Sequence, residues 1–203
     1  MIPFMETIVI YTPKGGASKS TLTRELGTAL SMKGKQVGLI DLDPQMSTTN
    51  WYNRRDDEMP MVIDHTANNL TKIKRAGVDY LIVDTPPGTH EQSEFFKKAD
   101  LVVIPVKPSP DDLVVAMRIG EELKKKKFVY VVVQTPPRAK ITESCARELA
   151  GVGKVAPVNM GFRVDYPTEA IHGKAAVEKK SSKANEEMNK LTTYLLRQLK
   201  SKG

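Results

Sequence analysis

The stretch from 13 to 21, Pro-Lys-Gly-Gly-Ala-Ser-Lys-Ser-Thr, constrains this 203-residue chain more than any other. A short apolar run at 8–11 precedes it, and a segment with helical spacing of leucines follows and ends at Gly34. A strand, a glycine-rich loop and a helix, in this order, form the setting in which a Lys-Ser or Lys-Thr pair binds phosphate. Backbone N–H groups of such a loop face the anion, and the helix dipole favours negative charge at the same place.

The residue types of this loop predict what each one does. Gly15 and Gly16 let the main chain approach phosphate oxygens that a Cβ would exclude. Lys19 supplies positive charge to the β- and γ-phosphates, and Ser20 supplies a hydroxyl ligand to Mg²⁺. The residues expected to contact a nucleotide are Lys14, Gly15, Gly16, Ala17, Ser18, Lys19, Ser20 and Thr21.

Two further segments place carboxylates where phosphates are expected. The apolar run at 36–40 leads into Asp41 and Asp43, and a second run at 80–83 leads into Asp84. In open α/β sheets, ligands bind at the carboxyl ends of the strands, so these acids are expected to point toward the phosphates. Acids beside a triphosphate are unfavourable unless they hold Mg²⁺ or orient a water. For Asp84, which ends an apolar strand, we expect support of Mg²⁺ through water.

Alternation of apolar runs with helix-like segments predicts the fold class. The chain is expected to form a single doubly wound α/β domain over 1–203, with a mainly parallel sheet and helices on both faces. The helix from 110 is expected to have Ser109 as its cap and Pro110 in its first turn. Strands are expected at 8–11, 36–40, 61–63, 80–83, 99–106, 128–134 and 155–158, and helices at 22–33, 68–75, 110–123, 142–150 and 182–199.

Composition excludes several classes of protein. The hydrophobic fraction of 40% and the charged fraction of 27% are those of an ordinary globular domain. No apolar run approaches the roughly 18 residues of a membrane span, and the first five residues lack the features of a secretion signal. Cys145 is the only cysteine, so an internal disulfide is excluded and a reducing compartment is favoured. We expect a cytoplasmic protein without an integral membrane segment.

Positive charge is concentrated in the last quarter of the chain. The net charge is +7, and the segment from Lys154 to Gly203 holds ten Lys and Arg against five Asp and Glu. A basic region on an otherwise balanced domain indicates a surface for polyanions. The alternative is a basic face that only meets solvent.

The phosphate loop departs from its most common form, because Pro13 and Ser18 stand where that form has glycine. Its Lys-Gly-Gly-x-x-Lys-Ser pattern resembles the deviant Walker A loop of the ParA/MinD family of ATPases, although most of that family has glycine at the position of Ser18. Asp-x-Asp-Pro-Gln at 41–45 resembles the family's switch I, and Thr-Pro-Pro-Gly at 85–88 is similar to its switch II. The resemblance covers essentially the whole chain and is strongest to the short plasmid-partition ParA proteins.

The resemblance implies a phosphate-loop NTPase fold and an enzyme that hydrolyses ATP to ADP and phosphate with Mg²⁺. Lys14 matches the signature lysine, which crosses the interface of a nucleotide-sandwich homodimer to the partner's phosphates. Asp43 matches the acid that positions the attacking water, and Asp41 is expected to support the metal. The implied catalytic residues are Lys14, Lys19 and Asp43; the implied metal-site residues are Ser20, Asp41 and Asp84. By position, Gln134 and Pro136 are implied to contact adenine.

The resemblance also implies a role in DNA segregation. An ATP-bound dimer would coat DNA without sequence preference on the nucleoid, and a ParB-like centromere-binding protein would stimulate hydrolysis. Arg163 and Lys174 match the basic positions that bind DNA in ParA relatives, and Lys179 and Lys180 lie nearby in sequence. Three alternatives stay open: a MinD-like positioning ATPase with a basic amphipathic C-terminal helix on a membrane, a metabolic enzyme with a phosphate loop, and a binding module without hydrolysis.

Overall fold

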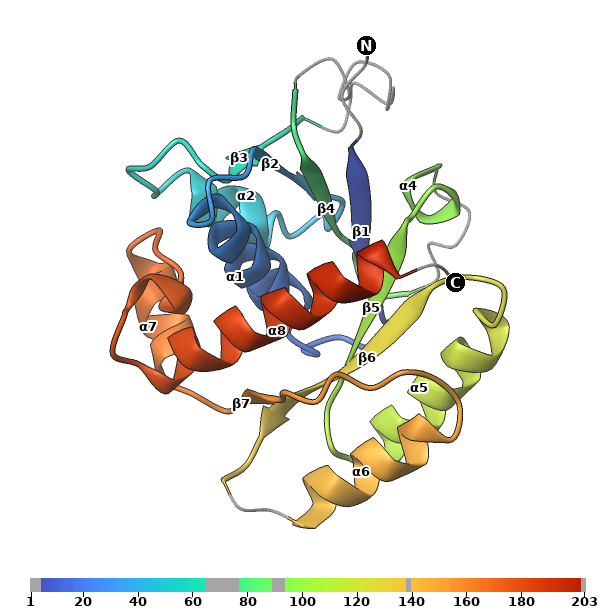
Figure 1. Ribbon diagram of the computed structural model, residues 1–203. Helices are drawn as coiled ribbons and strands as arrows, with labels where there is room; N and C mark the ends of the chain where they lie inside the picture. The colour runs from blue at the N-terminus through green and yellow to red at the C-terminus, as the bar shows by residue number, and fades with distance from the viewer. Residues whose placement is uncertain (1–4, 65–76, 89–93, 138–139, 202–203) are drawn as a thin grey trace.

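Seven strands rich in valine, isoleucine and leucine form one sheet in which every neighbouring pair is parallel (Figure 1). The computed structural model describes residues 5–64, 77–88, 94–137 and 140–201. Across the sheet the strands follow the order β3-β2-β4-β1-β5-β6-β7. Their bounds are Glu6–Ile10 (β1), Val37–Asp41 (β2), Met61–Val62 (β3), Tyr80–Asp84 (β4), Leu101–Val106 (β5), Phe128–Thr135 (β6) and Met160–Gly161 (β7).

Helices cover both faces of this sheet, which explains why its strands are almost continuous apolar runs. Helices α1, α2, α7 and α8 contribute side chains to the core on one face, and α4, α5 and α6 to the core on the other. In Figure 1, α1 and α8 cross the first face beside each other. The bounds are Lys19–Ser31 (α1), Ser47–Tyr52 (α2), Glu94–Lys97 (α4), Pro110–Glu122 (α5), Lys140–Ala150 (α6), Asp165–Ile171 (α7), Ala176–Glu178 (the 3₁₀ helix η2) and Lys183–Lys200 (α8).

These elements confirm the predicted α/β class and most of the expected segments. Ser109 caps α5 as predicted, since its hydroxyl accepts from the Asp112 N–H at 3.2 Å and proline follows it. The strand expected at 155–158 is wrong: Val155 forms an isolated bridge with Tyr130, and β7 lies further along the chain. A proline at 157 cannot donate to a ladder there. The helix expected at 68–75 lies outside the described residues.

The C-terminal helix α8 docks on the core. Its apolar stripe is buried, with 0% exposure at Met188, 1% at Leu191 and Leu195, and 7% at Leu199. The stripe therefore faces the core and is not exposed for contact with a membrane. Among the helices of the described ranges, none has the length and hydropathy needed to cross a bilayer.

The strand register brings three chain segments to one edge of the sheet. On adjacent parallel strands, Asp84 is the register partner of Ile10 in β1 and of Asp41 in β2. The loop that leaves β1 and the acids that end β2 and β4 therefore meet where ligands bind in open α/β sheets.

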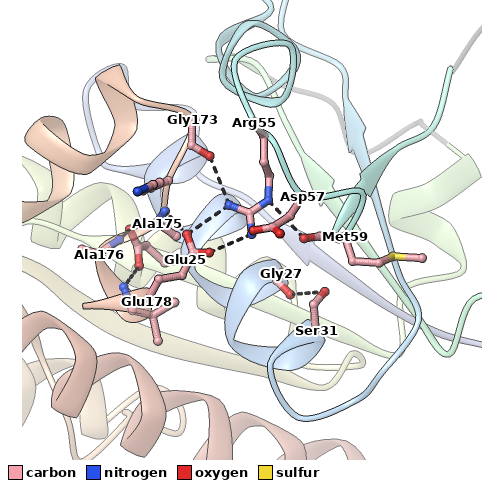
Figure 2. Close-up of polar contacts among 12 residues, drawn as sticks. Glu25, Gly27, Ser31, Arg55, Asp57, Met59, Gly173, Ala175, Ala176 and Glu178 are labelled. Carbon is pink, nitrogen blue, oxygen red and sulfur yellow. Dashed lines mark hydrogen bonds and ion pairs between the residues drawn. The ribbon is translucent and has the colours of Figure 1, made fainter. Parts of the chain in front are cut away.

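One buried carboxylate joins α1 to the C-terminal region. Glu25 is 2% exposed, and its two oxygens accept from the backbone N–H groups of Ala176 at 2.8 Å and Val177 at 2.9 Å (Figure 2). Burial raises the pKa of Glu25 from 4.5 to about 7, although these two hydrogen bonds and Arg24 act to lower it. An acid whose pKa is higher in the folded state binds its proton more tightly there, so folding becomes less favourable as the pH rises.

We expect Glu25→Gln to remove a pH dependence of stability. Relative to this variant, the parent's free energy of unfolding should fall as the pH rises from about 4.5, the ordinary value, to about 7. The fall is roughly 3–4 kcal/mol at most, since one pKa unit corresponds to about 1.4 kcal/mol. Urea unfolding at pH 5 and pH 8 measures it. Glu143→Gln, which changes an exposed carboxylate on α6, is the control and should keep the parental pH dependence. Parallel pH dependences for parent and Glu25→Gln would contradict the raised pKa.

Candidate nucleotide-binding site

The phosphate loop at 13–18 connects β1 to α1 through residues in unusual backbone conformations. Gly16 has φ +67°, and a Cβ placed on Gly15 or Gly16 would meet no heavy atom within 4 Å. The main chain therefore faces open space on this side, as the close approach of a phosphate requires. Ser18 precedes α1 with φ 60° and makes no side-chain cap, so the first N–H groups of α1 are left for a ligand.

The ammonium of Lys19 lies inside this loop. Lys19 is 7% exposed, and its Nζ donates to the carbonyl oxygens of Thr12 at 3.0 Å and Lys14 at 2.8 Å. Burial lowers the pKa of Lys19, while the nearby carboxylates of Asp84 and Asp43 act in the opposite direction. A desolvated cation that only neutral carbonyls bind is well suited to a phosphate oxygen.

The other residues of the loop occupy different environments. Ala17 is buried, with 1% exposure, while Ser20 and Thr21 in the first turn of α1 are partly buried. Lys14 is also partly buried, and its Nζ has no hydrogen bond or ion pair with any described residue. Within the described structure the two lysines of the loop thus differ: the ammonium of Lys19 is hydrogen-bonded and that of Lys14 is not.

Asp84 is a buried carboxylate, and one of its two oxygens has no partner among the described residues. Its exposure is 0%, its Oδ2 accepts from Thr48 Oγ1 at 2.7 Å, and the Ser20 hydroxyl is near enough to act on its pKa. Its Oδ1 has no hydrogen-bond partner within the described structure. Burial raises the pKa of Asp84 to about 6, and the two hydroxyls oppose that rise. A carboxylate oxygen and a serine hydroxyl, side by side, fit a hard divalent cation with its water ligands.

Asp41 has its oxygens occupied by the start of α2. Oδ2 accepts from the N–H groups of Thr48 and Thr49, both at 2.9 Å, and Oδ1 accepts from the Asp43 N–H at 3.1 Å. The residue that precedes α2, Met46, makes no side-chain cap, so Asp41 satisfies these amides from β2. The contacts give Asp41 a structural role, and its support of a metal stays a prediction.

Asp43 lies within electrostatic range of Lys19 and is partly exposed. One of its oxygens accepts from the Gln45 N–H at 2.9 Å, and its charge raises the pKa of Lys19. Asp43 is therefore near the phosphate loop and still accessible to solvent. A residue that orients a water needs both properties.

The segment after β4 is fastened to the same loop. Thr85 Oγ1 donates to the Ile10 carbonyl at 2.8 Å, and the Gly88 N–H donates to the Pro13 carbonyl at 3.1 Å. The Thr-Pro-Pro-Gly turn is therefore in direct contact with both ends of the strand-to-loop junction, where loss of a phosphate would be felt.

Gln134 supports the phosphate loop from β6. It has φ 52°, and its Nε2 donates to the Gly16 carbonyl at 2.8 Å and to Ser18 Oγ at 2.9 Å. No motif in the sequence indicates this role, and the predicted contact of Gln134 with adenine stays a prediction. Pro136 is exposed and lines a groove of about 910 Å³ between the β6–α6 connection and α8. Its predicted contact with adenine is not tested by this geometry.

The four residues expected to bind DNA fall into two groups. Arg163 is paired with Glu187 of α8, including an Nε–Oε2 distance of 3.2 Å, and Lys179 is paired with Asp165 at 2.7 Å. Their charges are neutralised locally, because packing brings an acid to each. Lys174 and Lys180 are exposed, and neither has an ion pair with another described residue. The geometry therefore favours the second pair as free cations, and DNA binding by the first pair stays a prediction.

Comparison with known proteins agrees with this geometry. Residues 8–152 match the model of the CobQ/CobB/MinD/ParA nucleotide binding domain. The Protein ParA of Rhizobium radiobacter is 34% identical over 143 residues, which are 64% of each chain. The chain thus spans 64% of the length of this relative, and less than half of others that it matches.

Two solved structures share the fold. A variant of Cyanothece McdA in complex with ATP has a TM-score of 0.75 at 18% identity, with 99% of this chain and 98% of that chain covered. The septum site-determining protein MinD from Pyrococcus horikoshii OT3, complexed with Mg-ADP, also has a TM-score of 0.75 at 18% identity, with 98% and 100% covered. Because the family model covers most of the chain, this protein belongs to the CobQ/CobB/MinD/ParA family of nucleotide-binding domains.

Proposed function

We propose that this chain is a ParA-like ATPase of DNA partition, which forms an ATP-dependent homodimer and binds DNA without sequence preference. A ParB-like centromere-binding protein would stimulate hydrolysis, and the protein would act in the cytoplasm on the nucleoid. The observation that carries the proposal is the contrast between the two lysines of the loop. Lys19 is bound inside its own subunit, whereas Lys14 has no partner in the described residues, so its charge is available to a second subunit.

The residues present fit ATP and Mg²⁺. The loop leaves open space beside Gly15 and Gly16. Oδ1 of Asp84 has no hydrogen-bond partner in the described structure, and the Ser20 hydroxyl lies near the same carboxylate. Ser20 and Asp84 would hold the ion, which would neutralise charge on the β- and γ-phosphates when bound. The similarity to a ParA protein and to structures with ATP and Mg-ADP supports this assignment.

The residues of the candidate site have separate roles in hydrolysis. Lys19 compensates the charge of the phosphates, and the amides at the start of α1 bind their oxygens. Asp43, which is partly exposed and within electrostatic range of Lys19, orients the attacking water. Lys14 of the partner stabilises the charge that develops on the transferred phosphoryl group. Such trans cations can contribute roughly 10³–10⁵ in rate.

The DNA-binding part of the proposal depends on exposed cations outside the loop. Lys174 and Lys180 are both exposed on the segment that joins α7 to α8. Dimerisation would double the number of such cations on one particle and strengthen attachment to the phosphate backbone. The buried apolar stripe of α8 supports DNA over a membrane as the surface that the protein binds.

Lys19→Ala should weaken MgATP binding by about 10- to 150-fold, because the phosphates lose a charged donor worth about 1.5–3 kcal/mol. Isothermal titration calorimetry measures the change. Lys35→Ala, which removes an exposed lysine after α1, is the matched control and should bind as the parent does. Parental affinity in Lys19→Ala would show that the loop does not hold the phosphates.

Lys14→Gln should keep MgATP binding by the monomer and lose ATP-dependent dimerisation and hydrolysis together. The reason is that Lys14 acts on the phosphates of the other subunit. Light scattering and phosphate release measure the two losses. A mixture of Lys14→Gln with Lys19→Ala should recover part of the ATPase activity, since one pocket of the heterodimer is intact and receives Lys14 from the other subunit. Parental hydrolysis by Lys14→Gln alone would refute action in trans.

The double variant Lys174→Ala/Lys180→Ala should weaken ATP-dependent binding to unrelated duplexes equally. Each lost phosphate contact should flatten the log–log salt dependence by about 0.9. Arg163→Ala should leave that slope unchanged, because Glu187 already neutralises Arg163. Fluorescence anisotropy at several salt concentrations measures the slopes. A strong preference for one sequence, or a larger change of slope in Arg163→Ala, would contradict the assignment.

A further inference from the structure

The C-terminal half of α2 and the turn after it are joined to the segment 173–178, more than a hundred residues away in sequence. Trp51, the only tryptophan of the chain, is 0% exposed, and its Nε1 donates to the Lys174 carbonyl at 2.9 Å. Arg54 donates to the Ala170 carbonyl at 3.3 Å. The backbone that carries the exposed lysine is therefore bound directly to the helix that follows Asp43.

Arg55 is the centre of this junction (Figure 2). Its side chain is 4% exposed, and every one of its five N–H donors has an acceptor. Two donate to the oxygens of Glu178, at 2.9 and 3.0 Å, and one to the Gly173 carbonyl at 3.1 Å. The other two bind the Met59 carbonyl at 3.1 Å and the Asp57 carboxylate at 3.3 Å.

The guanidinium of Arg55 also lies over the ring of Trp51, 5.2 Å from its centroid. A planar cation between an aromatic face and a two-oxygen acceptor has one favourable orientation, and a lysine could not reproduce it. The junction therefore fixes the distance and the angle between α2 and segment 173–178.

Close backbone contact completes the junction. Gly173 has φ +68°, and a Cβ on it would meet the Arg54 carbonyl oxygen at 2.2 Å. Only glycine permits both this conformation and this approach. The two backbones touch without an intervening side chain, so a shift of one displaces the other.

The opposite end of α2 lies in the candidate nucleotide site. Asp41 holds the N–H groups of Thr48 and Thr49, and Thr48 Oγ1 donates to Asp84, the predicted metal-site acid. The helix is six residues long, so the site and the junction lie at its two ends. On the other side, Glu25 of α1 binds the amides of Ala176 and Val177. Segment 173–178 is thus attached to both helices that border the site.

We propose that Arg55 and Trp51 are positioning residues that transmit the nucleotide state from α2 to segment 173–178 and so control the exposed cations Lys174 and Lys180. This inference rests on the proposed function and adds to it the route by which nucleotide regulates polyanion binding. A ligand that contacts Asp43, Thr48 or Asp84 shifts α2, and the junction moves the lysine-bearing segment with it. Coupling between two sites in proteins is typically 5- to 150-fold in affinity.

Hydrogen–deuterium exchange of the full chain, with and without MgATP, tests the route. In the parent, nucleotide should change exchange in both 47–58 and 173–180. In Arg55→Met, which keeps the stem and loses all five donors, only 47–58 should respond. Glu178→Gln removes the charge of the other partner of this ion pair with almost no change of shape. It should show the same loss of response in 173–180, and it replaces Arg55→Met if that variant folds poorly. Arg118→Met, at an arginine on α5 that is 69% exposed, is the control and should respond as the parent does.

A functional measurement separates positioning from general support of the fold. Arg55→Met and Glu178→Gln should lower the MgATP-dependent gain in duplex affinity by about 5- to 150-fold and change the Kd for MgATP by less than about twofold. Arg55→Lys should not restore the gain, because an ammonium cannot serve the five acceptors. Equal losses of MgATP affinity and duplex affinity in both variants would mean a merely structural role and overturn the proposal.

The exchange experiment also distinguishes this inference from the function on which it rests. A nucleotide response in 47–58 alone in the parent overturns the transmission, as does an unchanged response of 173–180 in both variants. A coupled response in a parent that binds no duplex at any salt concentration supports the transmission and rejects DNA as the polyanion.

Discussion

The candidate site depends on the register of three parallel strands. Asp84 ends the strand between β1 and β2, and its register partners, Ile10 and Asp41, lead into the phosphate loop and hold the start of α2. A buried carboxylate is unfavourable unless donors or a cation compensate it. Thr48 of α2 donates to Asp84, and the Ser20 hydroxyl of α1 lies near enough to lower the pKa of Asp84. One desolvated acid thereby draws α1, α2 and β4 to a common point, and the geometry of the site follows from the sheet.

The phosphate loop contains a residue in an unfavourable backbone conformation, and hydrogen bonds from β6 stabilise it. Ser18 and Gln134 both have positive φ, a conformation that is unfavourable by roughly 1–2 kcal/mol for residues with a Cβ. They contact each other, since Gln134 Nε2 donates to Ser18 Oγ and to the Gly16 carbonyl. Where glycine would adopt this conformation freely, serine adds a hydroxyl that β6 can bind. The loop is therefore bound to β6 as well as to β1 and α1.

Sequence predicted the features that depend on local pattern. The parallel strands that end at Asp41 and Asp84 and the Ser109 cap follow from periodicity and short motifs, and the structure contains them. The sequence alone does not indicate which side chains meet when they are far apart in the chain. Arg163 was assigned to DNA from its position and charge, yet β7 packs against α8 and brings Glu187 to it. The contact of Gln134 with adenine stays a prediction, and no local pattern indicates the positive φ that turns its amide to the loop. Nothing in the sequence indicated the contact of Trp51 with Lys174.

The junction around Arg55 is better explained by position than by stability. Taking an arginine and a glutamate out of water costs about as much as their attraction returns, so a buried pair is weak evidence for stabilisation. The Arg55–Glu178 pair instead fixes an orientation, because the five donors of Arg55 and the aromatic face beside it allow only one arrangement. A well-packed apolar contact would hold α2 against segment 173–178 while allowing it to slide. A fully bonded guanidinium does not, and the proposed transmission requires a junction that cannot slide.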